Sequence, residues 1–150
     1  MRTIIFLALM TLFSCSEEKE SSLENVDQPQ LSTNDYPQQW KLFKMTGSFD
    51  GSETTGEEME WQETYYFYQD KSFKKVRIKN NISVEAKGSF EILMSDEEAA
   101  FILTYNQPSE LIGNCTGDLK EHLSLRENNT VLQSSWMACD GPGLFYKRKN

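Results

Sequence analysis

The feature that most constrains this chain is an alternation of apolar and polar residues that runs from Trp40 to the C-terminus. It is clearest from Ile82 to Met94, where alternate residues are apolar or glycine and those between them, as far as Glu91, are Ser, Glu or Lys. A period of two places one set of side chains on each face of a β-strand. The sequence therefore predicts antiparallel strands with one buried face and one solvated face.

Turn residues divide this region into short segments. Eight strands are expected, at 40–46, 62–68, 72–79, 82–94, 99–105, 119–126, 130–139 and 144–149. Connections such as Gln69-Asp70-Lys71, Asn80-Asn81 and Glu127-Asn128-Asn129 favour hairpins. The fold class is thus predicted as all-β, a small antiparallel up-and-down β-barrel. Gly88 is interpreted as a bend or bulge in the longest strand, and Asp140-Gly141-Pro142-Gly143 as a rigid turn before the last one.

The first 14 residues have the pattern of a secretory signal peptide. Arg2 gives a positive start, and residues 4–13 are apolar apart from Thr11. Ten helical residues span only about 15 Å, which is too short to cross a bilayer. The string Leu12-Phe13-Ser14-Cys15 resembles the lipobox of bacterial lipoproteins, which implies a membrane anchor through lipid on Cys15.

Residues 15–36 are expected to form a flexible tether, because they are rich in Ser, Glu, Asn, Gln and Pro and lack apolar periodicity. The string Ser16-Glu17-Glu18-Lys19-Glu20 resembles the acidic signal of surface lipoproteins of the Bacteroidota. The expected location is the bacterial cell envelope, as an outer membrane lipoprotein, and surface exposure is the further implication of that string. The barrel domain is expected to occupy 37–150.

The two remaining cysteines, Cys115 and Cys139, are expected to form a disulfide bond. A metal site is the competing interpretation. One histidine and two cysteines do not complete a tetrahedral site without carboxylates, so no metal is expected.

The charge balance limits the classes of partner. The formal net charge is -8, which disfavours nucleic acid and anionic lipid head groups. Membrane attachment is therefore expected to come from the anchor, and basic proteins become natural partners.

No catalytic constellation is evident, and we expect neither enzyme activity nor a cofactor. The single histidine, His122, is expected to lie on the surface. Carboxylates are interpreted as solvated groups in two stretches, Glu57, Glu58, Glu60 and Glu63 in the first and Asp96, Glu97 and Glu98 in the second. Lys75, Arg77 and Lys79 share the face of Phe73, which is expected to be a solvated outer face, although an inward face could bind an anion.

The whole pattern resembles the small lipocalin-like lipoproteins of the Bacteroidota. The residues that carry the resemblance are Trp40-Lys41-Leu42, the Tyr-rich run 65–68, Gly88-Ser89-Phe90, Leu111-Ile112-Gly113-Asn114-Cys115, Trp136-Met137-Ala138-Cys139-Asp140-Gly141-Pro142-Gly143 and Tyr146. The resemblance implies a barrel that binds a small hydrophobic ligand. Candidate cavity-lining residues are Trp40, Tyr65, Phe67, Phe90, Phe101 and Trp136.

Two alternatives remain open. The same rings would serve to fill the core, and this interpretation is favoured for a domain of this size. The chain could instead be an acidic module that binds a basic protein through Glu53–Glu63, as inhibitors of basic envelope hydrolases such as lysozyme do.

Overall fold

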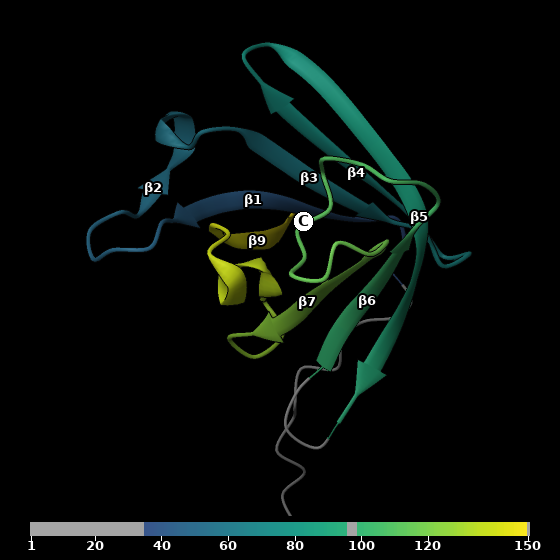
Figure 1. The fold of residues 1–150 in the computed structure, drawn as a ribbon. Helices are drawn as coiled ribbons and strands as arrows, with labels where there is room; N and C mark the ends of the chain where they lie inside the picture. The colour runs from purple at the N-terminus through teal and green to yellow at the C-terminus, as the bar shows by residue number, and fades with distance from the viewer. Residues whose placement is uncertain (1–34, 96–98, 150) are drawn as a thin grey trace, which may run out of the picture.

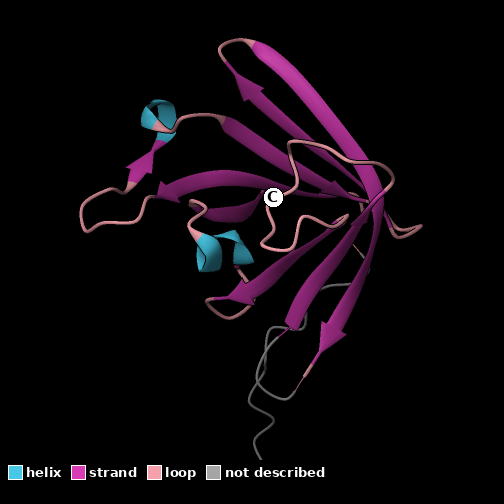
Figure 2. Ribbon diagram, viewed as in Figure 1, coloured by secondary structure: helices cyan, strands magenta, loops and turns pink. Residues whose placement is uncertain are grey.

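The computed structural model describes residues 35–95 and 99–149, which form one antiparallel sheet closed into an eight-strand barrel (Figures 1 and 2). The strand order is β2-β1-β3-β4-β5-β6-β7-β8-β9, and β1 also pairs with β9 to close the barrel. The long strands are β1 (Gln38–Thr46), β3 (Gln62–Phe67), β4 (Ser72–Lys79), β5 (Ile82–Met94), β6 (Ala99–Tyr105), β7 (Lys120–Arg126), β8 (Val131–Ser134) and β9 (Gly143–Lys149). All strand pairings of the described residues lie within 38–149.

The predicted all-β barrel is confirmed, and three strands, β4, β5 and β6, have the predicted bounds. The prediction of a strand as far as Cys139 is wrong. The chain leaves the sheet after Ser134 and forms a 3₁₀ helix, η2 (Ser135–Cys139). The Ser134 hydroxyl accepts a hydrogen bond from the Trp136 amide, which caps that helix.

A short outer segment was not expected from the sequence. The two-residue strand β2 (Thr54–Thr55) pairs with Lys44 and Met45 at the end of β1, and a 3₁₀ turn, η1 (Gly56–Glu58), follows it. This stretch carries no apolar alternation, so periodicity could not reveal it.

The tight turns follow from residues that tolerate a left-handed backbone. Asn80 and Asn81 have φ values of 51° and 62° between β4 and β5. Asparagine adopts such values more readily than most residues, and two of them in succession suit a two-residue hairpin. This predicted hairpin is confirmed.

Aromatic rings fill the inward face of the barrel. The ring centroids of Phe67 lie 4.7 Å from Phe101 and 4.9 Å from Phe90, and Phe73 lies 4.9 Å from Tyr105. Such pairs add to the stability that comes from burying their surface.

The ends of β5 depart from the expected burial pattern. Ala86, Gly88 and Phe90 are buried as expected, but Ile82 and Met94 are 66% and 67% exposed. The strand is longer than the barrel wall, and the β4–β5 hairpin projects beyond it (Figure 1).

Gly88 is not a bulge, because its register with β4 and β6 is continuous. The register shift of the barrel lies instead between Leu42 and Lys44 in β1. At Gly88 a Cβ atom would lie 2.0 Å from the Thr104 carbonyl oxygen and 2.7 Å from the Phe73 ring. Close approach of the neighbouring backbone and ring therefore explains the glycine.

The expected signal peptide, Cys15 and most of the tether lie in 1–34, outside the described residues. In 35–95 and 99–149, no helix has the length and apolar character needed to cross a membrane.

Candidate functional site

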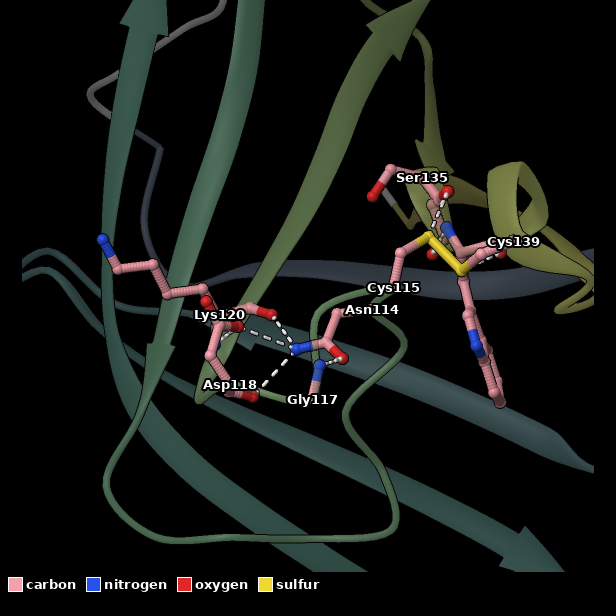
Figure 3. The surroundings of a disulfide bond; sticks show 9 residues. Asn114, Cys115, Gly117, Asp118, Lys120, Ser135 and Cys139 are labelled. Atoms are coloured by element: carbon pink, nitrogen blue, oxygen red, sulfur yellow. Dashed lines mark hydrogen bonds between the residues drawn. A yellow bond between two sulfur atoms is a disulfide. The ribbon is translucent and has the colours of Figure 1, made fainter.

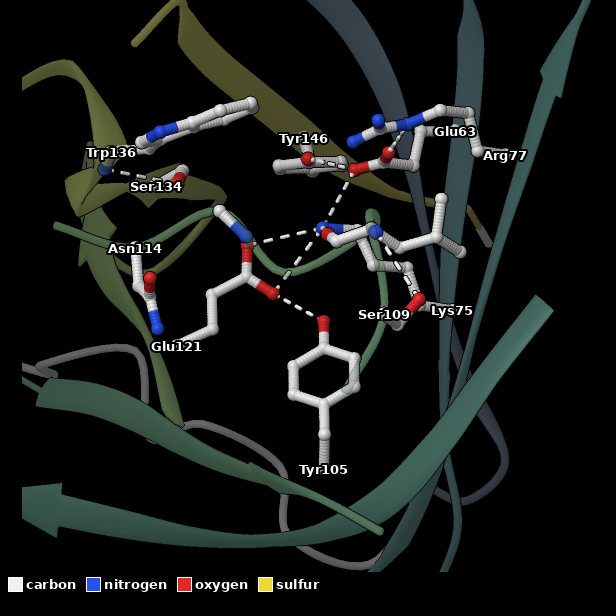
Figure 4. A network of polar contacts seen from close by, with 12 residues as sticks. Glu63, Lys75, Arg77, Tyr105, Ser109, Asn114, Glu121, Ser134, Trp136 and Tyr146 are labelled. Carbon is white, nitrogen blue, oxygen red and sulfur yellow. Dashed lines mark hydrogen bonds and ion pairs between the residues drawn. The ribbon is translucent and has the colours of Figure 1, made fainter. Parts of the chain in front are cut away.

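A charged network lies inside the barrel (Figure 4). Lys75 from β4 is 0% exposed, and Glu63 from β3 and Glu121 from β7 are 1% and 0% exposed. All three point to the inward face of the barrel. Core residues two positions away on the same strands, such as Phe73 and Leu123, share that face. The expectations that Lys75 faces solvent and that Glu63 is a solvated carboxylate are therefore wrong.

Lys75 is shared by both carboxylates. Its Nζ atom lies 3.1 and 3.2 Å from the two Glu121 carboxylate oxygens and 3.2 Å from Glu63 Oε1. It also donates a hydrogen bond of 2.6 Å to the Leu111 carbonyl. Buried charges require such multiple partners, because the interior does not solvate them as water does.

Two tyrosine hydroxyls donate further hydrogen bonds to the two buried carboxylates. Tyr146 donates to Glu63 Oε1 at 2.5 Å, and Tyr105 donates to Glu121. Burial, reinforced by the nearby carboxylates, raises the pKa of Tyr146 and that of Tyr105. Both phenols therefore stay protonated and remain hydrogen-bond donors.

Arg77 extends the network toward the end of the barrel. Its Nε atom donates to Glu63 Oε2 at 2.5 Å, and its guanidinium carbon lies 4.3 Å from the centre of the Trp61 ring. Its Nη2 atom is buried without a hydrogen-bond partner, and so is the indole Nε1 of Trp61. Unsatisfied buried donors of this kind are uncommon in folded proteins.

The loop 106–119 is held in the barrel by the same network. Leu111 is fully buried and its carbonyl accepts from Lys75, while the Gly113 amide donates to Glu121 Oε1 at 3.2 Å. Sequence reasoning had not singled out this loop as a contributor to the interior.

The predicted disulfide is confirmed: Cys115 and Cys139 are bonded, with Cα atoms 5.6 Å apart (Figure 3). The bond joins the loop 106–119 to η2. Beside it, the Asn114 side-chain amide donates to the carbonyls of Asp118 and Lys120, at 2.8 and 2.7 Å, which fixes the shape of the loop. In the described parts of the chain no group of three or more His, Cys, Asp or Glu residues could hold a metal ion.

A cavity of about 260 Å³, here termed the mouth cavity, lies beside the projecting hairpin. It is lined by Arg77, Lys79, Asn80, Ile82, Val84 and Glu110. Arg77 lies opposite Val84 in the β4–β5 register, and Lys79 lies opposite Ile82. The cavity therefore has adjacent cationic and aliphatic walls, and Glu110 comes from the loop 106–119.

The six predicted cavity-lining residues are not those that line the mouth cavity. Trp40, Tyr65, Phe67, Phe90 and Phe101 belong to the core, and Trp136 is half-buried against it. The Phe67 ring lies within contact distance of the Tyr65, Phe90 and Phe101 rings. Their role in holding a ligand stays a prediction.

Several polar residues lie where the sequence suggested. His122, Glu57, Glu58 and Glu60 are exposed, whereas 96–98 fall outside the described residues. In the acidic stretch proposed for a basic partner, Glu53 pairs with Lys44 and Glu60 with Lys79. That stretch is therefore partly neutralised from within the chain, and the basic-partner function stays a prediction.

The interior charges had a signal that sequence reasoning missed. Glu63 falls at the same alternate positions as Trp61, Tyr65 and Phe67, and Glu121 at the same alternate positions as Leu123 and Leu125, so each carboxylate shares the apolar face of its strand. A carboxylate in register with an apolar face predicts either burial with a cation or a strand that ends early.

Comparisons of the chain with protein-family models, with curated proteins and with solved structures gave no match. What the structure establishes is a closed antiparallel barrel, compatible with a lipocalin-like fold, with an ionic network inside it and a small cavity at its mouth.

Proposed function

We propose that this chain is an outer membrane lipoprotein, anchored through Cys15, whose barrel binds a small amphipathic carboxylate in the mouth cavity. The N-terminal sequence supports the anchor, and the geometry around Arg77 supports the ligand. This proposal refines the expected small hydrophobic ligand by adding an anionic head group.

The observation that carries the proposal is the unsatisfied guanidinium nitrogen of Arg77. Its Nη2 atom is buried and has no hydrogen-bond partner, while its Nε atom is engaged by Glu63. Leaving a buried donor unpaired costs about 1 to 3 kcal/mol. Arg77 lines the mouth cavity, so a rotation of its guanidinium would bring the buried Nη2 atom to a carboxylate oxygen there, and the bond would be a strong, charge-assisted one.

The other walls define the rest of the ligand. Val84 is half-buried and Ile82 is largely exposed, so both have apolar surface to bury against an alkyl chain. The second cation, Lys79, is already paired with Glu60, and Glu110 is acidic, so the cavity disfavours a ligand with more than one negative charge. The volume of about 260 Å³ suits a short or medium acyl chain.

The test is a titration of the fragment 35–150 with octanoate, followed by tryptophan emission and by calorimetry. Trp61 stacks on Arg77, so occupation of the cavity should change its emission. In W61F the emission change should disappear while the calorimetric binding remains.

The decisive variant is R77K, which keeps the charge and the pair with Glu63 but lacks the guanidinium fork. It should weaken octanoate binding about ten-fold, the value expected for one charge-assisted hydrogen bond. V84T should weaken binding several-fold, and its matched control V76T, on the outer face of β4, should leave binding unchanged. Equal affinity of R77K and the wild type, or equal affinity for octanol and octanoate, would contradict the proposal.

A further inference from the structure

A segregated basic surface lies on the outer wall of this acidic chain. The strands β9, β1, β3 and β4 are neighbours in the barrel wall (Figure 1). They contain a single carboxylate, Glu63, and that carboxylate is buried. Their outward positions include Lys41, Lys74, Lys147 and Lys149. We call these four residues the lysine face.

Three of the four residues of the lysine face, Lys41, Lys147 and Lys149, have no carboxylate partner in the part of the chain that is described, whereas Lys74 interacts electrostatically with Glu85 of β5. None of its four lysines forms an ion pair with a carboxylate of 35–95 or 99–149. Lys41 lies directly opposite Lys147 in the β1–β9 register. Lys74 lies opposite Lys87 in the β4–β5 register, but there Glu85 pairs with Lys87 at 2.9 Å and interacts with Lys74. Like charges in directly opposed positions destabilise a sheet, so an anion bound between Lys41 and Lys147 would relieve their repulsion.

Aromatic rings lie among these lysines. The Lys147 Nζ atom is 4.5 Å from the centre of the Phe43 ring, and the Lys74 Nζ atom is 4.9 Å from that of Tyr66. The rings hold the ammonium groups over the surface without removing their charge.

A groove of about 360 Å³ runs along the same wall. Lys41, Lys147 and Lys149 line it together with Phe43 and Met59. The groove thus offers cations for an anionic group and apolar surface for the methylenes attached to it.

We propose that the lysine face and its groove bind the phosphate head groups of an anionic membrane surface. The choice of a membrane among polyanions rests on the proposed anchor at Cys15 and on where the chain enters the barrel. Strand β1 begins at Gln38, and its second residue, Gln39, pairs with Lys149. The preceding Asp35 accepts a hydrogen bond from Arg148 through its carbonyl at 3.1 Å. The segment that leads from Cys15 therefore joins the barrel beside this face.

The net charge of -8 does not oppose this arrangement, because a membrane meets one face of the molecule at a time. Solvent ions screen charges beyond about 8 Å at physiological salt, so carboxylates on the far wall contribute little. The expected repulsion from anionic lipid follows from the net charge of the whole molecule, whereas the lysine face has a positive charge of its own.

The test uses the fragment 16–150, which lacks Cys15 and so separates this face from the anchor. Co-sedimentation with vesicles of phosphatidylglycerol and phosphatidylcholine should retain the fragment, whereas pure phosphatidylcholine vesicles should not, and retention should fall with added salt. Each lysine near an anionic surface contributes about five-fold in binding. K41Q/K147Q should therefore reduce retention by about 25-fold.

The matched control is K71Q/K120Q, which makes the same change in net charge at two exposed lysines, one in the β3–β4 turn and one on β7, that are not part of the lysine face. It should leave retention almost unchanged, and R77K should retain vesicle binding because the mouth cavity is a different site. Without vesicles, K41Q/K147Q should melt no lower than the wild type, since it removes a like-charge pair.

Three results would overturn the proposal: equal retention by both kinds of vesicle, equal weakening by the two double variants, or retention by a DNA oligonucleotide without retention by vesicles. Failure of octanoate to bind would overturn the proposed ligand and leave this inference intact.

Discussion

Lys75 shows how one residue organises the interior. It is the only cation within hydrogen-bonding distance of Glu121 among the described residues, and it shares Glu63 with Arg77. The two cations and two carboxylates balance. A buried ion pair adds little stability over an apolar substitute, but removal of one partner leaves an uncompensated charge.

We predict that K75M destabilises the fold by about 3 to 5 kcal/mol, because Glu121 is then buried without a cation. Urea denaturation followed by far-UV circular dichroism measures the change. The control is K74M, one position along β4 and on the outer face, which should change stability by less than about 0.5 kcal/mol. Similar losses in the two variants would show that the network is not a stability determinant.

The buried tyrosines predict a loss of stability at high pH. Burial raises the pKa of Tyr65, Tyr105 and Tyr146 above the ordinary value of about 10. Below that pH both folded and unfolded chains are protonated. Above it only the unfolded chain ionises, so each tyrosine lowers the free energy of unfolding by about 1.4 kcal/mol per pH unit.

The check is a series of urea melts between about pH 8 and pH 11 on the wild type and on Y146F. The variant should be less stable at neutral pH, because Glu63 loses a donor, but its stability should fall less steeply above about pH 10. Parallel slopes for the two proteins would mean that Tyr146 does not keep its proton.

The sequence pattern correctly placed Lys75 on the same face of its strand as Phe73, but it did not predict that this face is buried. The alternation placed it on the face of Phe73, and the general rule that lysines are solvated then favoured an outer face. Its partner Glu121 lies 46 residues away in sequence, on a strand that does not neighbour β4. Only closure of the barrel brings the two together.

At the scale of elements, regular alternation was sufficient to predict the strands, and the loops were not predictable in the same way. Strands β4, β5 and β6 have their predicted bounds because apolar residues and turn residues agree there. Segment 135–139 contains strand-forming residues, yet the Ser134 cap makes it a 3₁₀ helix. The loop 106–119 has no periodicity, and contacts with the barrel interior determine its path.

The disulfide should contribute to stability by limiting the unfolded chain. Cys115 and Cys139 are 24 residues apart, and closing a loop of that size is worth about 3 kcal/mol. C115S/C139S should lower the free energy of unfolding by about that amount, measured by urea denaturation.

Both cysteines are exposed, so a reductant should reach them and reproduce the effect in the wild type. The reductant should leave the double variant unchanged, which provides the internal control. No loss in either case would show that the loop 106–119 is held by the ionic network alone.

At the scale of the whole molecule, closure through β1 and β9 determines whether the barrel forms. β9 pairs with β1 on one side and β8 on the other, and it supplies Tyr146 to the network. Without β9, β1 and β8 would become open edges, and such edges promote aggregation.

We therefore predict that the fragment 35–150 unfolds in one cooperative transition and that 35–142, which lacks β9, does not fold. Far-UV circular dichroism during urea titration, with size-exclusion chromatography, distinguishes a monomeric barrel from an unfolded or aggregated chain. The fragment 16–150 is the control, and its urea midpoint should equal that of 35–150, because every strand pairing among the described residues lies within 38–149. A folded 16–150 beside an unfolded 35–150 would contradict this, since it would make the preceding segment part of the folding unit.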